Sequence, residues 1–461
     1  MVAQGDSAWS EHGSSRFADC RIPRRIAGHM TDQLDSPAPA VLSAAQRYLV
    51  LAAAFLGWMF GGTQMGITTL VMRSAASDLL VTADETLLKV WVTRYVCSFL
   101  LGAAAGGLLF GWIGDRIGRA RALGLAVLCY SLVTALAFLA QTPEQLLVIR
   151  FIACLGVGGV WPNGVALASE AWSDASRPML AGLIGASANV GLMLTGLVDI
   201  NYEIGPENWR WVMVVGATPA LLGLFVLLAV PESPRWLAQR DHRTAEKAST
   251  PAPSVAIGEV FRPPLLWVTL VGICLGTIPL LGGWGSVNWL IIWADKVGAD
   301  VGVNDLKGWT QLARSGGGTI GSLLGGWIAT RLGRRTSYFL ISLGALVLGQ
   351  FIFYTLDPSK TPLAVWFVWI TLLGFVATIY FGWLPLFLPE LFPTRARATG
   401  AGVSFNFGRI LAAGAVLLTG VLIKRFDSDY SQIGQITSLI FAVGMVVIWF
   451  APDTSQRKLD D

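Results

Sequence analysis

The chain has 461 residues, of which 54% are hydrophobic and only 13% are charged, and its mean hydropathy is +0.60. Soluble globular proteins carry about 25% charged residues, so this composition excludes a soluble enzyme. The formal net charge of +4 is too small for a chain that binds nucleic acid through a basic surface. We therefore expect an all-α protein embedded in a lipid bilayer, with no nucleic-acid partner.

Apolar runs long enough to cross about 30 Å of hydrocarbon recur along the chain. These runs are continuous and do not alternate with polar residues, which favours helices over a barrel. Twelve transmembrane helices are predicted, in two groups of six. The first group lies near 47–72, 87–112, 121–141, 145–170, 179–200 and 210–230. The second group lies near 265–294, 307–330, 337–356, 363–388, 397–423 and 434–451.

This division predicts two six-helix bundles, over residues 47–230 and 265–451. The polar segment 1–46 has no apolar core of its own, so we expect a disordered tail and not a cleaved signal peptide. The segment 231–264 contains six prolines and is expected to link the bundles. Residues 452–461 are predicted to form a second, C-terminal tail.

Basic residues are distributed unequally between the two sides that these spans imply. With the N-terminus inside, the inner segments hold 21 of the 33 Lys and Arg residues, the outer segments hold eight, and four lie within spans. Loops rich in Lys and Arg stay on the cytoplasmic side of a membrane. Both termini are therefore predicted to be cytoplasmic, in a multi-pass protein of the inner (plasma) membrane.

Two internal repeats relate the groups of spans. Residues 106–120 align without gaps to residues 321–335, with nine identities in 15 positions. The pattern G-x-S-x-N-x-G occurs at 185–191 and again at 402–408. The two offsets are nearly equal, which indicates a duplicated bundle. Duplicated halves are a transporter architecture in which the substrate site lies between the halves near the midplane.

Four motifs resemble those of one transporter family. The loop at 111–119 reads GWIGDRIGR and resembles the signature loop of the major facilitator superfamily. The segments PESPRW at 231–236, ELFPTR at 390–395 and GGVWP at 158–162 resemble motifs of its sugar porters and of its metabolite:proton symporters. The resemblance implies two pseudo-symmetric six-helix bundles and a secondary transporter that works by alternating access.

The signature loop and its surroundings supply the residues expected to hold an inner gate. Gly111 permits a tight turn, and Asp115 could lie against the positive N-terminus of a helix from the other bundle, a contact of about 0.3–1 kcal/mol. The resemblance implies the span that begins near Arg397 as that partner; the alternative is that the loop determines topology only. The further gating candidates are Arg116, Arg119, Arg150, Glu232, Arg235, Arg331, Arg334, Glu390 and Arg395.

Four arginines fall within the predicted spans, namely Arg94, Arg150, Arg314 and Arg409. A charge at the bilayer centre costs at least ~2.5 kcal/mol, so each should face protein or a water-filled cavity. Arg409 lies near mid-depth and is the candidate for substrate or gate electrostatics; the alternative is a structural arginine that caps carbonyl groups. For Arg150 the structural role is favoured.

Acidic residues are missing where proton-coupled relatives carry them. The resemblance implies Asp residues in a D-x-x-D pattern in the first span and a Glu in the fourth, but these positions hold Gly61, Gln64 and Val160. Clear acids within the spans occur only near span ends. The hypothesis is a net cationic core that suits a small anionic or polyhydroxylated substrate, with proton coupling weakened or absent; a co-transported proton remains an open alternative.

Polar and aromatic side chains that could line the cavity complete the candidate site. Amide and indole groups bind hydroxyls or carboxylates, and aromatic rings stack on apolar faces of a substrate. The alternative is hydrogen bonding between helices, worth about 0.6 kcal/mol each, which we favour for Asn189 and Asn406. The candidate substrate-binding residues are Gln64, Thr63, Trp161, Asn163, Trp284, Asn288, Tyr380, Trp383, Asn406 and Arg409.

The sequence therefore predicts a monomeric secondary transporter of a small organic metabolite. Organic anions, including acidic sugars, are the favoured substrates because of the arginines. A neutral sugar or polyol facilitator, supported by the PESPR motif, and a solute sensor without net transport are the alternatives. No nucleophile–base pair, cofactor motif or metal-ligand set occurs within the spans, so neither an enzyme nor a cofactor is expected.

Overall fold

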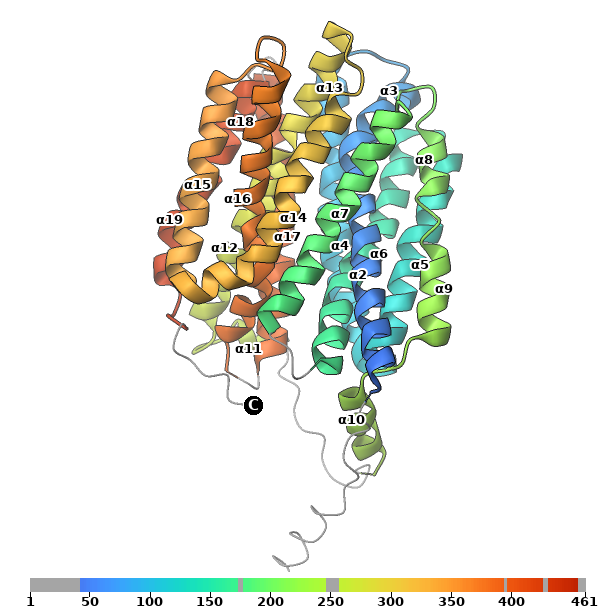
Figure 1. The fold of residues 1–461 in the computed structure, drawn as a ribbon, viewed down its shortest axis with the longest axis vertical. Helices are drawn as coiled ribbons and strands as arrows, with labels where there is room; N and C mark the ends of the chain where they lie inside the picture. Colours follow the sequence, from blue (N-terminus) through green and yellow to red (C-terminus); the bar gives the residue numbers. More distant parts are fainter. Residues whose placement is uncertain (1–41, 173–176, 246–256, 394–395, 426–429, 455–461) are drawn as a thin grey trace, which may run out of the picture. The chain divides into compact units, whose positions relative to one another are not determined.

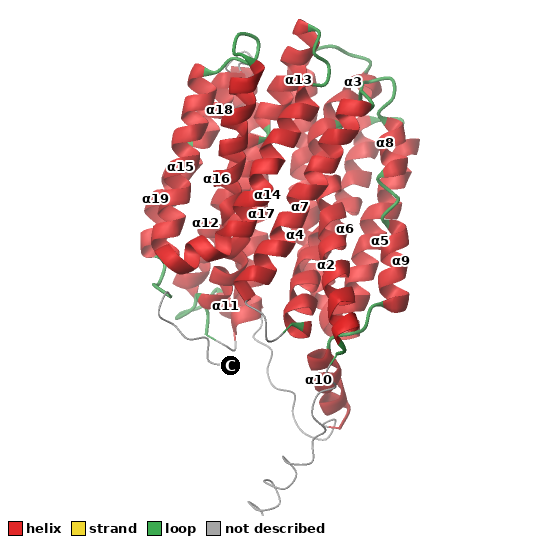
Figure 2. Ribbon diagram, in the orientation of Figure 1, coloured by secondary structure: helices red, strands yellow, loops and turns green. Residues whose placement is uncertain are grey.

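The computed structural model describes residues 42–172, 177–245, 257–393, 396–425 and 430–454. Within these ranges every regular element is a helix (Figure 2). The described residues belong to one structural unit that begins at Leu42. Most of the two predicted tails, at 1–46 and 452–461, lies outside the described residues.

The first six predicted spans correspond to helices that run back and forth through the bundle (Figure 1). They are α2 (Ala44–Leu70) with its continuation α3 (Met72–Leu80), α4 (Glu85–Ile117), α5 (Arg119–Leu136) with a 3-10 turn, α6 (Pro143–Ala171), α7 (Arg177–Asn201), and α8 (Arg210–Val215) with α9 (Ala220–Ala229). We call them the first half. The predicted linker contains α10 (Pro234–Ala245) and α11 (Ile257–Val260).

The second half follows the same plan after the linker. It comprises α12 (Leu266–Gly282), a π-helical turn (Gly283–Val287) and α13 (Trp289–Val301), then α14 (Leu306–Leu332), α15 (Arg334–Thr355), α16 (Leu363–Glu390), α17 (Arg397–Arg425), and α18 (Tyr430–Ser438) with α19 (Ile440–Val447). The end of the bundle where α10 and α11 lie is called here the linker end, and the opposite end, where α3 and α13 lie, is called the far end (Figure 1).

Eleven helical segments among the described residues are long and apolar enough to cross a membrane. The remaining long helix is α14, whose Lys307, Arg314 and three consecutive glycines at 316–318 make it less apolar. Its 27 residues extend about 40 Å at 1.5 Å per residue, which is enough to cross the hydrocarbon. Each of the twelve predicted spans therefore has a helical counterpart.

Side-chain caps explain why three helices begin two or three residues before the predicted apolar runs. Ser43 and Gln46 form a capping box at the start of α2. Asp84 and Thr142 accept hydrogen bonds from backbone N–H groups in the first turns of α4 and α6. A cap satisfies N–H groups that have no partner within the helix, so the helix can start in polar sequence ahead of the hydrocarbon.

The internal repeat appears in the backbone geometry of the two halves. Gly118 separates α4 from α5 with φ = +112°, and Gly333 separates α14 from α15 with φ = +81°. Residues with a Cβ rarely adopt these angles, so the last glycine of each repeat copy is required by its turn. On the preceding turn of each copy, an arginine lies over a tryptophan ring, Arg116 over Trp112 and Arg331 over Trp327.

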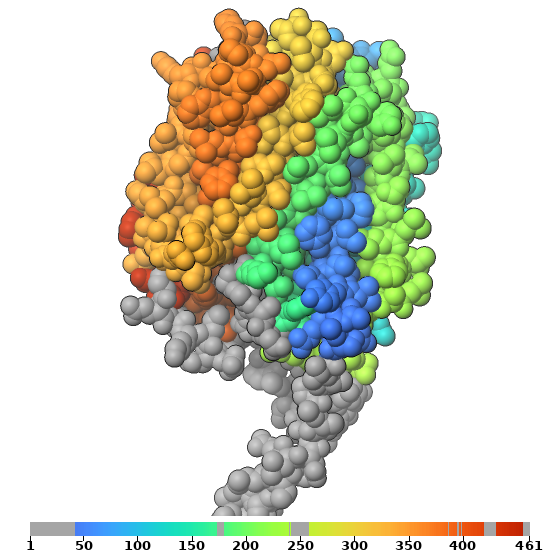
Figure 3. Space-filling model, viewed as in Figure 1, coloured from blue at the N-terminus to red at the C-terminus, as the bar shows by residue number. Residues whose placement is uncertain are grey.

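Glycines allow helix backbones to approach closely in both halves. A Cβ atom on Gly106 of α4 would lie 1.9 Å from the carbonyl oxygen of Leu155 in α6. In the second half, a Cβ atom on Gly317 of α14 would lie 2.0 Å from the carbonyl oxygen of Thr371 in α16. The halves meet where α4 packs on α17 and where α7 packs on α14. Figure 3 shows the green residues of α7 lying along the gold residues of α14.

Substitution of a contact glycine tests this packing. Gly106→Ala is expected to lower the free energy of unfolding by about 1–3 kcal/mol, because the added methyl group must separate α4 from α6. Gly414→Ala is the control, since a Cβ atom there meets nothing within 4 Å, and it should raise stability by up to about 1 kcal/mol through helix propensity. Thermal unfolding of the detergent-purified protein measures both; equal effects would contradict the packing.

Candidate functional site

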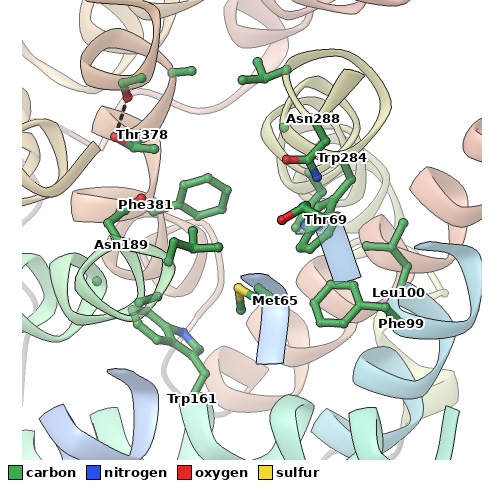
Figure 4. Close-up of a pocket in the computed structure, with 18 of the residues that line it drawn as sticks. Met65, Thr69, Phe99, Leu100, Trp161, Asn189, Trp284, Asn288, Thr378 and Phe381 are labelled. Atoms are coloured by element: carbon green, nitrogen blue, oxygen red, sulfur yellow. Dashed lines mark hydrogen bonds between the residues drawn. The ribbon is translucent and has the colours of Figure 1, made fainter. Parts of the chain in front are cut away.

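A cavity of about 130 Å³ lies between the two halves (Figure 4). This is room for a small metabolite, because a single water molecule needs about 10–15 Å³ of such space. The walls come from α2, α4, α6 and α7 of the first half and from α12, the π-helical turn, α14, α16 and α17 of the second. The cavity therefore lies where a duplicated transporter is expected to bind its substrate.

Aromatic rings from both halves form much of the cavity wall. Trp58 and Trp161 of the first half lie with their ring centroids 5.0 Å apart. Phe99 of α4 and Trp284 of the π-helical turn lie 4.3 Å apart and join the two halves. Figure 4 shows Phe381 facing the cavity on the side opposite Trp284. These rings offer flat apolar surfaces to a bound molecule.

The polar groups of the cavity carry positive charge and no negative charge. Arg314 of α14 and Arg409 of α17 are among the lining residues, whereas none of the described lining residues is acidic. Uncharged hydrogen-bonding groups are supplied by Asn189, Asn288, Thr69 and Thr378. In an environment of low dielectric such a site attracts an anion.

Four of the ten predicted substrate-binding residues line this cavity, namely Trp161, Trp284, Asn288 and Arg409. The structure places the other six elsewhere. Thr63 lines a separate apolar crevice of about 160 Å³ between α2, α7 and α8. Asn406 accepts a hydrogen bond from Arg409 and donates one to the carbonyl oxygen of Gly402.

Three more predicted residues are packed within one half. Asn163 of α6 donates hydrogen bonds to the carbonyl oxygens of Phe110 and Gly159, so it ties α6 to α4. The hydroxyl of Tyr380 lies 2.6 Å from that of Ser342. Trp383 is buried in the apolar core of the second half. Their predicted cavity positions are corrected because these side chains are buried inside a bundle and are not among the residues that line the cavity.

Gln64 is also not at the cavity wall, contrary to the prediction. It is fully buried, and its Oε1 accepts hydrogen bonds from Thr134 at 2.8 Å and from Arg150 Nη1 at 3.0 Å. Its Nε2 donates to the carbonyl oxygen of Gly216, at the break between α8 and α9. Arg150 Nη2 donates to the Gln64 carbonyl oxygen and to Thr68 Oγ1. The buried guanidinium of Arg150 is thus held by uncharged acceptors, in the structural role favoured above.

The predicted gating residues at the linker end bind within their own halves. Asp115 pairs with Arg119 at 2.6 Å, and its carbonyl oxygen accepts a hydrogen bond from Trp236 of α10. Glu232 of the PESPRW motif accepts a hydrogen bond from the N–H of Ala120 at the start of α5. These partners differ from the predicted one at the start of α17, because Arg119 and α10 lie next to the signature loop.

The second half has an equivalent contact. Arg334, at the start of α15, donates two hydrogen bonds to Glu390 at the end of α16, with distances of 3.1 and 2.9 Å. In each half, therefore, a glutamate from one of the sequence motifs binds the start of the helix that follows the glycine turn. Among the other gating candidates, Gly111 has open space at its Cβ position and Arg235 is exposed; Arg395 lies outside the described residues.

An ion network at the far end joins the halves and was not predicted. Asp295 of α13 accepts from Arg73 of α3 at 2.9 Å and from Lys307 of α14 at 3.0 Å. Lys307 also lies 3.7 Å from Asp199 of α7, and Arg73 pairs with Glu85 of α4. The first signal in the sequence was the occurrence of Asp199 and Asp295 near span ends. Because Arg73 and Asp295 are 222 residues apart, spacing along the chain does not reveal the pair.

Two further contacts between the halves lie closer to the cavity. Arg409 Nη1 of α17 donates to the carbonyl oxygen of Ala103 in α4 at 3.0 Å. Asn189 of α7 donates to Ser322 of α14 at 3.3 Å. Asn189 was predicted to be structural and makes this contact from the cavity wall. The halves are thus connected at the far end and again beside the cavity.

Comparison with known proteins identifies relatives along most of the chain. The family model described as Major Facilitator Superfamily matches residues 53–415. A putative metabolite transport protein of Haemophilus influenzae is 27% identical over 420 residues, which cover 89% of this chain and 97% of the relative. A putative niacin/nicotinamide transporter of Bacillus subtilis is 26% identical over 425 residues, with 90% and 98% covered. A crystal structure of a D-xylose-proton symporter superposes with a TM-score of 0.65 at 19% identity, covering 88% of this chain and 99% of that chain.

Removal of Lys307 tests the far-end network. Lys307→Met leaves Asp199 and Asp295 without this ammonium group and is expected to cost about 3–5 kcal/mol of stability, as for other broken buried pairs. Adding Asp199→Asn should recover part of the loss, because one unpaired charge is removed. Lys360→Met is the control, since its pair with Asp357 is exposed and worth about 0–1 kcal/mol. Thermal unfolding measures all three; equal losses for the two lysines would argue against the network.

Proposed function

The chain belongs to the major facilitator superfamily, and from this premise we propose that it carries a small organic anion across the membrane by alternating access. It is a multi-pass membrane protein and a secondary transporter, not an enzyme. The observation that carries the substrate proposal is the charge of the cavity, with Arg314 and Arg409 among its described lining residues and no acid. A buried carboxylate needs such a partner, because an unpaired buried charge is costly.

The aromatic wall narrows the proposed substrate to a flat, unsaturated or aromatic monocarboxylate. Rings such as Trp161, Trp284 and Phe381 can stack on a planar group, while guanidinium groups bind a carboxylate through paired hydrogen bonds. The similarity to a putative niacin/nicotinamide transporter supports a substrate of this kind. Acidic sugars share the carboxylate but lack a planar group, so they belong to the broader class of organic anions and not to this narrower one.

A neutral sugar or polyol is the second candidate, since the chain carries the PESPR motif at 231–235. Glu232 of this motif contacts the start of α5 at the linker end, far along the helices from the cavity. The motif therefore stabilises the turn before α5 and does not indicate which substrate is bound. A sensor that binds a solute without transporting it is the third candidate and is separated from the others by a flux measurement.

The proposed orientation places the linker end in the cytoplasm of a cell whose plasma membrane holds the protein. Support comes from the 21 basic residues of the inner segments, compared with eight in the outer ones. In this orientation the ion network of Arg73, Asp295 and Lys307 lies at the outer end of the bundle. We also propose that the protein works as a monomer, because each chain contains both halves of the cavity wall.

Uptake into proteoliposomes tests the substrate proposal. We expect transport of nicotinate and benzoate above the level of protein-free liposomes, with little transport of glucose or xylose, because only the acids can pair with the cavity arginines. The measurement is uptake of radiolabelled substrate with and without a pH gradient. Transport of neutral sugars alone would overturn the anion assignment, and saturable binding without flux would favour the sensor.

The pair of Gln64 and Arg150 generates a prediction on proton coupling. The three described acceptors of Arg150, which are Oε1 and the carbonyl oxygen of Gln64 and Oγ1 of Thr68, are uncharged at all physiological pH values. We therefore propose that coupling is weak or absent and that a protonophore leaves wild-type nicotinate uptake in place. Gln64→Glu puts a carboxyl group where Oε1 lies 3.0 Å from Arg150. Uptake by this variant should be lower than that of the wild type at every pH tested, because the guanidinium of Arg150 keeps the adjacent carboxyl group ionised and the resulting buried ion pair locks the first half.

The control for this variant is Gln46→Glu in the same helix. Gln46 is the third residue of α2 and belongs to its capping box, where Glu serves equally well, so uptake by this variant should match the wild type. The measurement is the initial rate of uptake between about pH 5.5 and 8, a range in which a carboxyl group beside a guanidinium stays ionised. Loss of wild-type uptake on adding a protonophore would contradict the uncoupled mechanism.

A further inference from the structure

We infer that Arg314 is the residue that binds the substrate carboxylate, that Gln311 positions it, and that Arg409 serves the contact between the halves. This inference rests on the proposed transport of an organic anion and names the subsite for its charge. The sequence had pointed to Arg409 because of its depth in the membrane. The two arginines differ, however, in what their guanidinium groups already bind.

Arg409 is already engaged in the contact between the halves. Its side chain is only 6% exposed. Its Nη1 donates to the carbonyl oxygen of Ala103 in the first half and to Oδ1 of Asn406 in its own helix, at 3.0 and 3.1 Å. Its guanidinium also lies 4.8 Å from the ring centroid of Phe405. A group held on two sides in this way links α17 to α4 and has little freedom to follow a substrate.

Arg314 has an unused hydrogen-bond donor. Its Nη2 donates to Oε1 of Gln311 at 3.1 Å, but its Nε is buried and has no hydrogen-bond partner in the described part of the chain. No described carboxylate forms a salt bridge with it. A buried donor without an acceptor costs about 1–3 kcal/mol. A substrate carboxylate would remove this cost, since it can accept from Nε and a terminal nitrogen at the same time.

The residues next to Arg314 on the same helix face also lack acceptors. Gln311 is fully buried and Ser315 is 1% exposed, yet Nε2 of Gln311 and Oγ of Ser315 have no hydrogen-bond partner among the described residues. Residues three and four apart share one face of a helix, so three donors with unmet hydrogen-bonding capacity lie together on α14. Of the three, Arg314 lines the cavity, so an anion in the cavity would supply an acceptor to the guanidinium.

The packing of α14 fixes the position of this face. A Cβ atom on Gly374 of α16 would lie 2.1 Å from the carbonyl oxygen of Arg314, so the two helices are in backbone contact at this level. On the other side, Gly196 of α7 leaves space for Gln311, whose Cγ would lie 3.4 Å from a Cβ atom there. Gln311 is thus held between helices, and its Oε1 directs the guanidinium of Arg314. It is a positioning residue and is not itself among the cavity-lining residues.

The test compares nicotinate with nicotinamide, which have the same ring and differ in charge. In proteoliposomes, Arg314→Gln is expected to raise the KM for nicotinate by about 10- to 100-fold, the loss typical of a hydrogen bond to a charged group, and to change the KM for nicotinamide much less. Arg314→Lys should restore part of the preference for the acid, because the charge returns without the paired geometry. Arg409→Gln should lower the maximal rate for both compounds and keep their KM ratio.

Gln311→Glu provides an independent readout for the positioning role. The variant side chain has the same shape, but its carboxylate would pair with Arg314 and neutralise it, so nicotinate should lose its advantage while nicotinamide retains its KM. A residue needed only for packing would not change the ratio of the two compounds. Thermal unfolding of each variant shows that folded protein is being compared, and quenching of tryptophan fluorescence by nicotinate in detergent measures binding separately from transport.

The outcomes separate this inference from the proposed function. If wild-type protein takes up nicotinate in preference to nicotinamide and Arg314→Gln keeps that preference, the assignment of Arg314 is overturned and the transport of anions stands. If Arg409→Gln removes the preference instead, the roles of the two arginines are reversed and the inference fails. If the wild-type protein transports sugars and no carboxylate, the proposed function fails and the inference fails with it.

Discussion

Each buried arginine of this protein needs oxygen acceptors for its N–H groups, and this requirement determines many of the contacts in the interior. A guanidinium inside a bilayer-embedded bundle loses its hydration, so its N–H groups must find other partners. Arg150 finds them in Gln64 and Thr68 and ties the first half together. Arg409 finds one across the interface at Ala103. Arg314 Nε has no hydrogen-bond partner among the described residues. The acceptors that each guanidinium binds therefore indicate its role. Arg150 stabilises the first half, Arg409 connects the two halves, and Arg314 is available to bind a substrate.

The duplicated halves share their turns and helix packing but not their charges. The glycine turns at Gly118 and Gly333 and the close approaches of α4 to α6 and of α14 to α16 recur in both. The acidic Asp115 of the first copy has Thr330 as its counterpart. Both cavity arginines come from the second half, whereas the first half contributes Trp161, Thr69 and other uncharged groups. The proposed site is thus polarised, with its charge on one half and aromatic surface on both.

The spans could be predicted because crossing hydrocarbon requires long apolar helices, and depth along a span placed Arg409 near the cavity level. The rotation of each helix could not be predicted in the same way. A helix that is apolar nearly all round has no polar stripe to indicate which face turns inward, and Gln64 was assigned to the cavity although it faces Arg150. The far-end network could not be predicted because its members, such as Arg73 and Asp295, are distant in the chain.

The placement of both cavity arginines on the second half affects how substrate binding can be coupled to the motion of the halves. Arg314 and Gln311 move together on α14, so the proposed carboxylate contact would survive a change in the angle between the halves. The aromatic walls include Phe99 from the first half and Trp284 from the second, so a bound ring would contact both halves only when they are close. A ligand shifts a conformational equilibrium only by its difference in affinity for the two states. The charge would therefore hold the substrate throughout the cycle, while the ring would favour the closed arrangement.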